Sequence, residues 1–171
     1  KYKDKGFVIV GIHTPEFEFE KNYDNVRAAV EKFGIKFPVV LDNDYSTWTA
    51  YRNRYWPRKY LIDIDGYIVY DHIGEGAYEE TEQRIQEALT ERMMVLGEEG
   101  VISQPLTKEA LVLSGKGVSP ETYFGADRNE FFGNGTPGVA GVQTNLKVPN
   151  PLNPDVLYLS GDWNIAKEYA E

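Results

Sequence analysis

The sequence contains no cysteine, and this absence excludes several kinds of chemistry within its 171 residues. A disulfide framework, a thiolate metal site and a cysteine nucleophile all need sulfur that the sequence does not supply. Histidine is scarce too, because only His13 and His72 are present and they lie far apart. Two isolated histidines without carboxylate partners do not make a metal site. We therefore expect no bound metal and no cofactor.

Basic residues and long apolar runs are also in short supply. The chain has 18 Lys and Arg against 27 Asp and Glu, a formal net charge of −9, so it lacks the basic surface that neutralises phosphates. We expect no nucleic-acid partner. No apolar run approaches the roughly 18 residues of a membrane-spanning helix, and the opening residues KYKDKG lack the apolar core of a signal peptide. Direct membrane insertion by this segment is therefore not expected.

Regular apolar patterns are present in the first half of the chain. Residues 7–13 (FVIVGIH) and 37–41 (FPVVL) are short runs typical of strands covered on both faces. Between them, residues 22–34 place apolar side chains at helical spacing and end at a glycine, which indicates an amphipathic helix. The acidic cluster at residues 42–44 lacks the spacing of a calcium loop, so we interpret it as a cap for a short helix that follows.

A hairpin and a long helix complete this pattern. Residues 59–63 and 67–71 are predicted strands joined through Asp65-Gly66, a dipeptide that favours a tight turn. Residues 79–94 again carry apolar side chains at helical spacing. The predicted order is strand, helix, strand, helix, hairpin, helix, which is an α/β arrangement.

The composition of the sequence changes after residue 97. Residues 97–113 read as a linker, and the following stretch to residue 154 is crowded with Gly, Pro and Asn. The best strand candidate beyond it is VLYL at 156–159, which leads to SGDWNI, where Trp163 is predicted to anchor a β-sandwich type of core. We expect residues 114–171 to form the start of a second, β-rich domain.

The stretch RYWPRKYLIDIDGYIVYDHIG at 54–74, with FVIVGIH and FPVVLD, resembles the thioredoxin-like redoxin family, which includes the TlpA and AhpC/TSA types. Members carry a cis-proline before the LID strand, and Pro57 matches it. Only an X-Pro bond adopts cis at low cost, about 0.5–1 kcal/mol. A cis bond turns the preceding backbone toward an extended substrate. The resemblance implies that Trp56, Pro57 and Arg58 bind the substrate segment, although Trp-Pro also suits a core residue followed by a turn.

Longer motifs resemble the DipZ type of redoxin, in which a cytochrome c biogenesis membrane domain is fused to a redoxin and then to a carbohydrate-binding-like β-sandwich. They include GIHTPEFEFEKNYDNVRAAVEKFGI, NRYWPRKYLID, GEGAYEETEQRI and, further on, SPETYFGADR and LYLSGDW. The resemblance implies a redoxin domain at 1–96, a linker at 97–113 and a carbohydrate-binding-like domain beginning at 114. It also implies an extracytoplasmic location, a membrane electron-donor domain as partner and a role in cell redox homeostasis.

The sequence departs from the family pattern at its start. In the family, a strand and a helix with a Cys-X-X-Cys pair precede the element that FVIVGIH resembles. KYKDKG resembles the last turn of that helix, so we expect both reactive cysteines upstream of Lys1 and no catalytic residue here. The sandwich-like region is likewise expected to continue past Glu171. Because the missing strand is central in the family's sheet, its neighbours should have unpaired edges.

The resemblance implies a thiol:disulfide oxidoreductase that acts on protein disulfides through thiolate attack and a mixed disulfide. Alone, this chain is then expected to be inactive. Two alternatives stay open. One is a peroxiredoxin-type peroxide reductase, whose single cysteine would also lie upstream. The other is a non-catalytic binding protein that combines a degenerate redoxin with a glycan-binding module.

Two further residues are candidate neighbours of the active site. His13 ends a predicted buried strand, at the edge where sites of α/β proteins lie, although a structural histidine is the simpler interpretation. Glu16 suits either a carboxylate that tunes a nearby thiol or the acidic start of a helix. In the second domain, a set of aromatic residues fits a sugar-stacking platform or, more simply, an apolar core. The set is Tyr123, Phe124, Phe131, Phe132 and Trp163.

Overall fold

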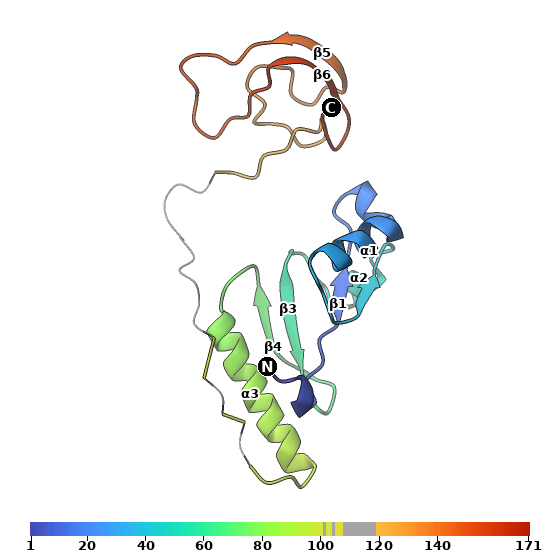
Figure 1. Cartoon of the computed structure of the whole chain (residues 1–171), viewed down its shortest axis with the longest axis vertical. Helices are drawn as coiled ribbons and strands as arrows, with labels where there is room; N and C mark the ends of the chain where they lie inside the picture. The colour runs from blue at the N-terminus through green and yellow to red at the C-terminus, as the bar shows by residue number, and fades with distance from the viewer. Residues whose placement is uncertain (101, 104, 108–118) are drawn as a thin grey trace. The chain divides into compact units, whose positions relative to one another are not determined.

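The chain divides into two compact units, Lys1–Val112 and Leu113–Glu171 (Figure 1). The computed structural model describes residues 1–100, 102–103, 105–107 and 119–171. Part of the predicted linker at 97–113 therefore lies outside the described residues. The first unit contains both helices and strands, and the described part of the second is β-rich. Each unit has a separate cluster of buried apolar side chains.

The first unit begins with a parallel pair of short strands. Strand β1 (Gly11–His13) pairs with β2 (Val39–Leu41), and the connection between them contains the 3-10 helix η2 (Glu18–Lys21) and helix α1 (Tyr23–Lys32). Asn22 caps α1 by accepting the backbone N–H of Asp24 at 2.8 Å. Beyond the helix, Gly34 has a φ of 63°, a left-handed conformation that glycine adopts without steric penalty. The predicted helix at 22–34 is thus confirmed.

The predicted strand at 7–13 is too long. Only its last three residues pair, because their partner β2 is itself three residues long. Val8, Ile9 and Val10 precede the paired residues and are exposed. The apolar run therefore does not mark a strand buried on both faces over its whole length.

A hairpin forms the second pair of strands. Strand β3 (Arg58–Ile62) runs antiparallel to β4 (Ile68–Ile73). The turn is closed by the Asp63 carboxylate, which accepts the backbone N–H groups of Asp65 at 3.0 Å and Tyr67 at 2.8 Å. The Asp65-Gly66 turn predicted from the sequence is confirmed.

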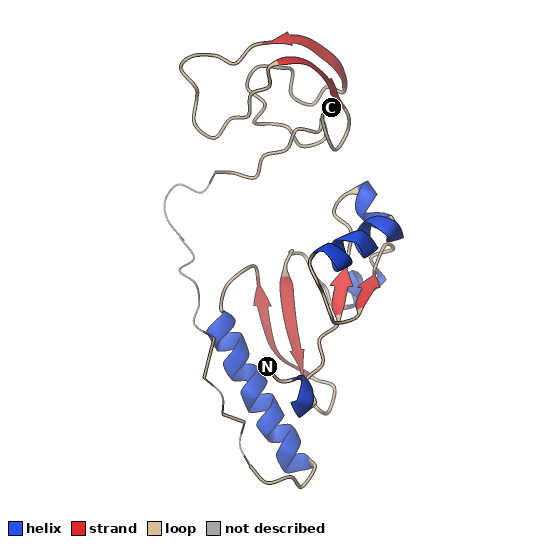
Figure 2. Cartoon of the chain, in the orientation of Figure 1, coloured by secondary structure: helices blue, strands red, loops and turns tan. Residues whose placement is uncertain are grey.

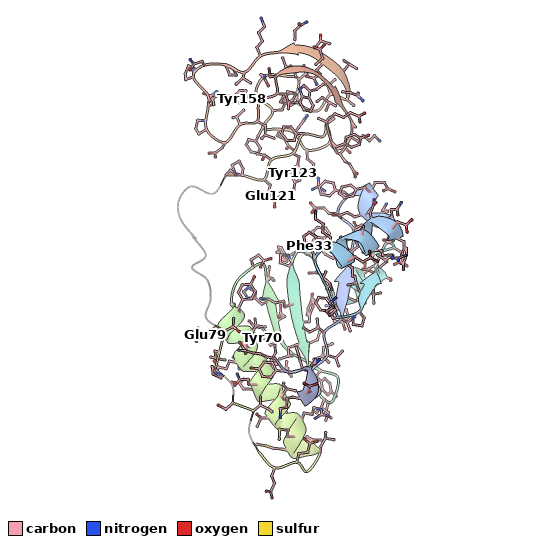
Figure 3. All side chains as sticks on the ribbon, in the orientation of Figure 1. Phe33, Tyr70, Glu79, Glu121, Tyr123 and Tyr158 are labelled. Atoms are coloured by element: carbon pink, nitrogen blue, oxygen red, sulfur yellow. The ribbon has the colours of Figure 1, made fainter. Side chains whose placement is uncertain are left out.

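Helices α2 (Ser46–Ala50) and α3 (Tyr78–Val95) complete the first unit, together with the 3-10 helix η1 (Lys3–Lys5). Leu89 of α3 is buried with Tyr2 and Ile102, so the N-terminal residues pack against this helix. A contact also joins the hairpin to α3, because the hydroxyl of Tyr70, which Figure 3 labels, lies 3.3 Å from that of Thr81.

The four strands of the first unit form two separate two-stranded sheets (Figure 2). Within the described residues, β1 pairs only with β2, and β3 pairs only with β4. Each strand therefore has one edge without a strand partner. Ile12 of β1 and Ile62 of β3 are both partly exposed, at 44% and 45%. In the part of the chain that the structure describes, the first unit thus has strand edges without a strand partner, while the expectation of a missing central strand stays a prediction.

The second unit contains one antiparallel pair, β5 (Gly141–Leu146) and β6 (Gly161–Ile165). Ile165 is fully buried and Trp163 packs against the core, in agreement with the prediction for that residue. The core consists of Ala126, Phe132, Leu146, Leu159 and Ile165. Within the described part of this unit, no second sheet faces the β5–β6 pair, so the region is β-rich without the two layers of a sandwich.

The strand predicted at 156–159 is wrong. Leu157 forms only an isolated bridge with Phe132. Two residues later, the backbone N–H of Leu159 donates to the side-chain oxygen of Asn134 at 3.0 Å, and its carbonyl accepts from the same amide at 2.6 Å. Because a side chain satisfies both backbone groups of Leu159, a ladder does not form there, and the strand begins at Gly161 instead.

None of the helices in the described ranges has the length and apolar character needed to cross a bilayer. Those same ranges contain no group of three or more His, Asp or Glu side chains arranged to hold a metal ion.

Candidate functional site

The loop between α2 and β3 carries the residues singled out by the sequence. The peptide bond between Trp56 and Pro57 is cis, the conformation predicted for it. Both side chains are exposed, and the indole of Trp56 retains 49% of its accessible surface. The carbonyl of Pro57 accepts the backbone N–H of Gly74 at 2.8 Å, which joins the start of β3 to the end of β4. The loop thus leads directly into a fixed hairpin.

The indole of Trp56 is held by two contacts. Its ring packs against the ring of Trp48 from α2, with centroids 4.2 Å apart and planes inclined by 35°. Its Nε1–H donates to the backbone carbonyl of Thr14 at 3.1 Å. Thr14 follows β1, so a half-exposed ring in one loop is anchored to both a helix and the end of a strand in the parallel pair.

A buried carboxylate organises these anchors. Asp42, which follows β2, is 2% exposed. It accepts the backbone N–H groups of Thr47 at 2.8 Å and Trp48 at 2.9 Å, as expected of a helix cap. It also accepts hydroxyl hydrogen bonds from Thr14 at 2.9 Å and Ser46 at 3.2 Å. The capping role was predicted from the sequence, whereas the bond to Thr14 was not.

The protonation of Asp42 follows from this environment. Burial disfavours the charged form and by itself raises the pKa. The backbone donors from Thr47 and Trp48, followed by the hydroxyls of Thr14 and Ser46, together outweigh burial, so the pKa of Asp42 is lowered. The group is therefore a carboxylate, and it accepts hydrogen bonds through both oxygens.

Arg58 lies at the first position of β3 and its charge is used within the hairpin. Its Nη2 and Nε donate to the same oxygen of Asp71, at 2.6 and 3.1 Å. The guanidinium also lies over the ring of Tyr60, 4.8 Å from the ring centroid. The side chain is only 18% exposed. Arg58 is thus placed beside the loop, with its charge paired across the two strands.

The structure brings His13 and Glu16 to the same region. His13 ends β1, and its Nε2 lies 3.1 Å from the carbonyl oxygen of Glu20. The backbone N–H of Glu16 donates to the side chain of Glu20 at 2.7 Å. Both residues are half-buried and flank Thr14, whose carbonyl accepts from Trp56. The turn after β1 and the Trp-Pro loop are therefore neighbours.

The aromatic residues of the second unit do not act as one set. Phe132 is buried in the core, and Trp163 packs on that core while its Nε1–H donates to the carbonyl of Ser160 at 2.9 Å. Tyr123 and Glu121 are labelled in Figure 3, and the hydroxyl of Tyr123 donates to Glu121 at 3.1 Å. Arg128 lies over the ring of Tyr123. The core interpretation therefore holds for Phe132 and Trp163.

The loop that carries Trp56 and Pro57 has a geometry better suited to binding than to catalysis. The aromatic residues Tyr55 and Trp56 are exposed, at 50% and 49%, beside the start of β3, and exposed apolar side chains next to a strand can receive an extended peptide. The sequence supplies no thiol that could react there. What the site offers is a preorganised apolar contact beside the end of β1.

No family model matches the chain. The chain is 41% identical over 136 residues to protein DipZ of Mycobacterium tuberculosis, a match that covers 78% of the chain and 19% of DipZ. It is 34% identical over 82 residues to the thiol-disulfide oxidoreductase ResA of Bacillus anthracis, which covers 48% of the chain and 44% of ResA.

Among solved structures, the chain matches the solution structure of a protein described as a thioredoxin from Neisseria meningitidis. The two are 28% identical, with a TM-score of 0.46, over 51% of this chain and 55% of that chain. The chain thus covers less than two thirds of the length of each of these relatives.

Proposed function

We propose that this chain, a thioredoxin-like redoxin related to DipZ, forms the substrate-binding part of a thiol:disulfide oxidoreductase that acts on protein disulfides. The observation that carries the proposal is the anchored, half-exposed Trp56 at the step into β3. The relative ResA is a thiol-disulfide oxidoreductase, which supports the class of reaction. Because the chain has no cysteine, the two reacting sulfurs belong, in this proposal, to residues of the natural protein outside these 171.

The reaction would proceed by disulfide exchange. A thiolate of the protein attacks one sulfur of the substrate disulfide, a mixed disulfide forms, and the other substrate sulfur leaves as a thiolate. The second thiol of the protein then attacks the mixed disulfide, which releases the reduced substrate and leaves the protein oxidised. The chain's own residues bind the substrate segment and hold it in place while this exchange occurs.

Three residues have assigned parts in this binding. The ring of Trp56 packs on the substrate, and because the ring is already held by Trp48 and Thr14, little conformational freedom is lost on binding. Pro57 extends the exposed surface of Trp56 that contacts the substrate. Arg58 is paired with Asp71, so its part is to orient the start of β3 and not to offer a free charge to the substrate. His13 and Glu16 lie on the adjoining turn, as neighbours of the substrate.

The proposed type, location and partner of the protein follow from its relationship to DipZ. We assign the protein to the DipZ type, in an extracytoplasmic location, with a membrane electron-donor domain as partner and roles in cytochrome c biogenesis and cell redox homeostasis. The support for this assignment is the 41% identity to DipZ. Residues 114–171 would then begin a carbohydrate-binding-like domain.

The test uses the natural full-length protein and insulin as the disulfide substrate. We expect Trp56→Ala to lower kcat/KM about tenfold, which corresponds to ~1.4 kcal/mol of binding. Tyr67→Ala is the matched control, because Tyr67 is an aromatic residue of the same hairpin, is 71% exposed, and lies at the turn end rather than at the loop.

Three results would contradict the proposal. A full-length protein that reduces peroxide but not insulin would favour the peroxiredoxin alternative, and one that does neither would favour a binding protein. Equal losses in the Trp56 and Tyr67 variants would move the binding surface away from the loop. Turnover of insulin by the 171-residue chain alone would show that the sulfurs outside it are not needed.

A further inference from the structure

The carboxylate of Asp42 reaches Trp56 by two separate routes. Through Oδ2 it accepts the hydroxyl of Thr14, and the carbonyl of Thr14 accepts the indole N–H of Trp56. Through the same oxygen it accepts the backbone N–H of Trp48, whose ring packs on that of Trp56. Two segments that are far apart in the sequence are thereby fixed by one atom, and both segments contact the same indole.

We infer that Asp42 is a positioning residue for substrate binding, which orients Trp56 through Thr14 and Trp48 without touching the substrate. This inference rests on the proposed function and assigns a role to a residue outside the loop itself. Asp42 is almost fully buried, so it has no direct access to a protein substrate. Its effect on binding must pass through the groups that it holds.

A carboxylate suits this role because it accepts hydrogen bonds at both oxygens. The four donors around Asp42 are two hydroxyls and two backbone N–H groups. An asparagine of the same shape has one accepting oxygen, and its NH2 group only donates. Two of the four donors would then lose their acceptor, and a buried donor without a partner is unfavourable. The contacts to Thr14 and Trp48 share Oδ2, so one orientation of the amide releases both.

The loop is sensitive to such a change because Trp56 is half exposed. A buried ring would be held by its surroundings, whereas a half-exposed ring depends on the few contacts it makes. Small displacements of groups that orient a substrate lower the rate strongly. Loosening Trp48 and Thr14 should therefore weaken the binding of a protein substrate more than that of a small disulfide, which makes no extended contact with the loop.

The matched control is Asp44→Asn. Asp44 is exposed, lies at the same end of α2, and accepts the backbone N–H of Ser46 at 3.2 Å, but it makes no contact with Thr14, Trp48 or Trp56 among the contacts described. Asp42→Asn and Asp44→Asn thus remove the same charge two residues apart. Thr14→Val is the second test variant, because it retains the size of the side chain and removes only the hydroxyl of one route.

The experiment measures kcat/KM of the full-length protein for insulin and for 5,5′-dithiobis(2-nitrobenzoic acid), a small disulfide, and takes their ratio. We expect Asp42→Asn and Thr14→Val to lower the ratio about fivefold and Asp44→Asn to leave it unchanged. The near-ultraviolet circular dichroism of the Trp48–Trp56 pair, obtained by difference from Trp56→Phe, should weaken in Asp42→Asn and persist in Asp44→Asn.

The outcomes separate this inference from the proposed function. An unchanged ratio in both Asp42→Asn and Thr14→Val, or an equal loss for both substrates, overturns the positioning role while leaving the oxidoreductase in place. If the unmodified protein reduces neither substrate, the proposed function fails. In that case the dichroism still decides whether Asp42 orients the indole pair, since an intact signal in both Asp42→Asn and Thr14→Val overturns that geometry. If Asp42→Asn does not fold, Thr14→Val carries the same comparison.

Discussion

Replacement of Glu82 by glutamine should destabilise the first unit in a way that depends on pH. Glu82 is a buried acid of α3. Its Oε1 accepts from Lys1 Nζ and from the hydroxyl of Tyr2, each at 2.6 Å, and its Oε2 accepts the backbone N–H of Thr107 at 2.6 Å. One carboxylate therefore holds the first two residues and the segment at 105–107 on the same helix.

The magnitude follows from the pKa of this carboxyl. The hydrogen bonds from Lys1, Thr107 and Tyr2, in that order, outweigh burial and lower the pKa of Glu82 from 4.5 to about 2. At roughly 1.4 kcal/mol per pH unit, the lowering of the pKa from 4.5 to about 2 stabilises the charged form by at most about 3–4 kcal/mol. The side chain of Lys1 is 44% exposed, so solvent screening reduces this to about 1–2 kcal/mol. We expect Glu82→Gln to lower the unfolding free energy by that amount at pH 7.

The sign of the pH dependence follows from the lowered pKa. A carboxyl whose pKa is lower in the folded state contributes its stability above the unfolded value and loses it as the pH falls through the folded value. The difference between the original protein and Glu82→Gln should be complete above pH 4.5 and should shrink between pH 4.5 and 2. All other carboxylates titrate in both proteins, so the difference isolates Glu82.

The assay is guanidinium-induced unfolding, followed by circular dichroism over a pH series from 7 to 2. Glu87→Gln is the control, because Glu87 lies on the same helix and pairs with Arg84 at 3.0 Å with both side chains about half exposed. Its loss should change the unfolding free energy by less than ~0.5 kcal/mol. A Glu82→Gln difference that is the same at pH 7 and pH 2 would refute the argument, because it would come from packing and not from the charge.

Two further predictions test other contacts. Arg58→Met and Asp71→Asn should each lower the unfolding free energy by about 1 kcal/mol, and a double-mutant cycle should give a coupling energy of similar size; additive effects would mean that the pair contributes nothing. In the second unit, a Cβ at Gly125 would lie 2.5 Å from the carbonyl oxygen of Lys167 and closer still to the backbone of Glu168. Gly125→Ala should therefore destabilise by about 3 kcal/mol, more than Gly138→Ala, where φ is 74° but the space is open and about 1 kcal/mol is expected. Equal thermal shifts in these two variants would contradict the steric argument.

The sequence predicted the elements whose signals are local. The hairpin depends on Asp63 and on the turn that follows, all within five residues, and α1 depends on Asn22 at its start. The failures have a different origin. In the apolar run at 7–13, only the three residues that face β2 form strand hydrogen bonds. In VLYL at 156–159, the backbone groups of Leu159 bond to the side chain of Asn134, 25 residues away, instead of to a neighbouring strand. A hydrophobic pattern shows that a segment is able to form a strand, whereas the neighbouring segments determine whether it does.

The same difference between local and distant contacts separates Trp56 and Pro57 from Asp42 in the candidate site. Trp56 and Pro57 were predicted as site residues because the short motif around them resembles the thioredoxin-like redoxin family. Asp42 was recognised only as a helix cap, since its bonds to Thr47 and Trp48 lie within six residues. Its bond to Thr14 joins residues 28 apart, and that of Trp56 to Thr14 joins residues 42 apart. No hydrophobic periodicity encodes contacts between residues so far apart, so the carboxylate that holds Trp56 through Thr14 is recognised only in the folded structure.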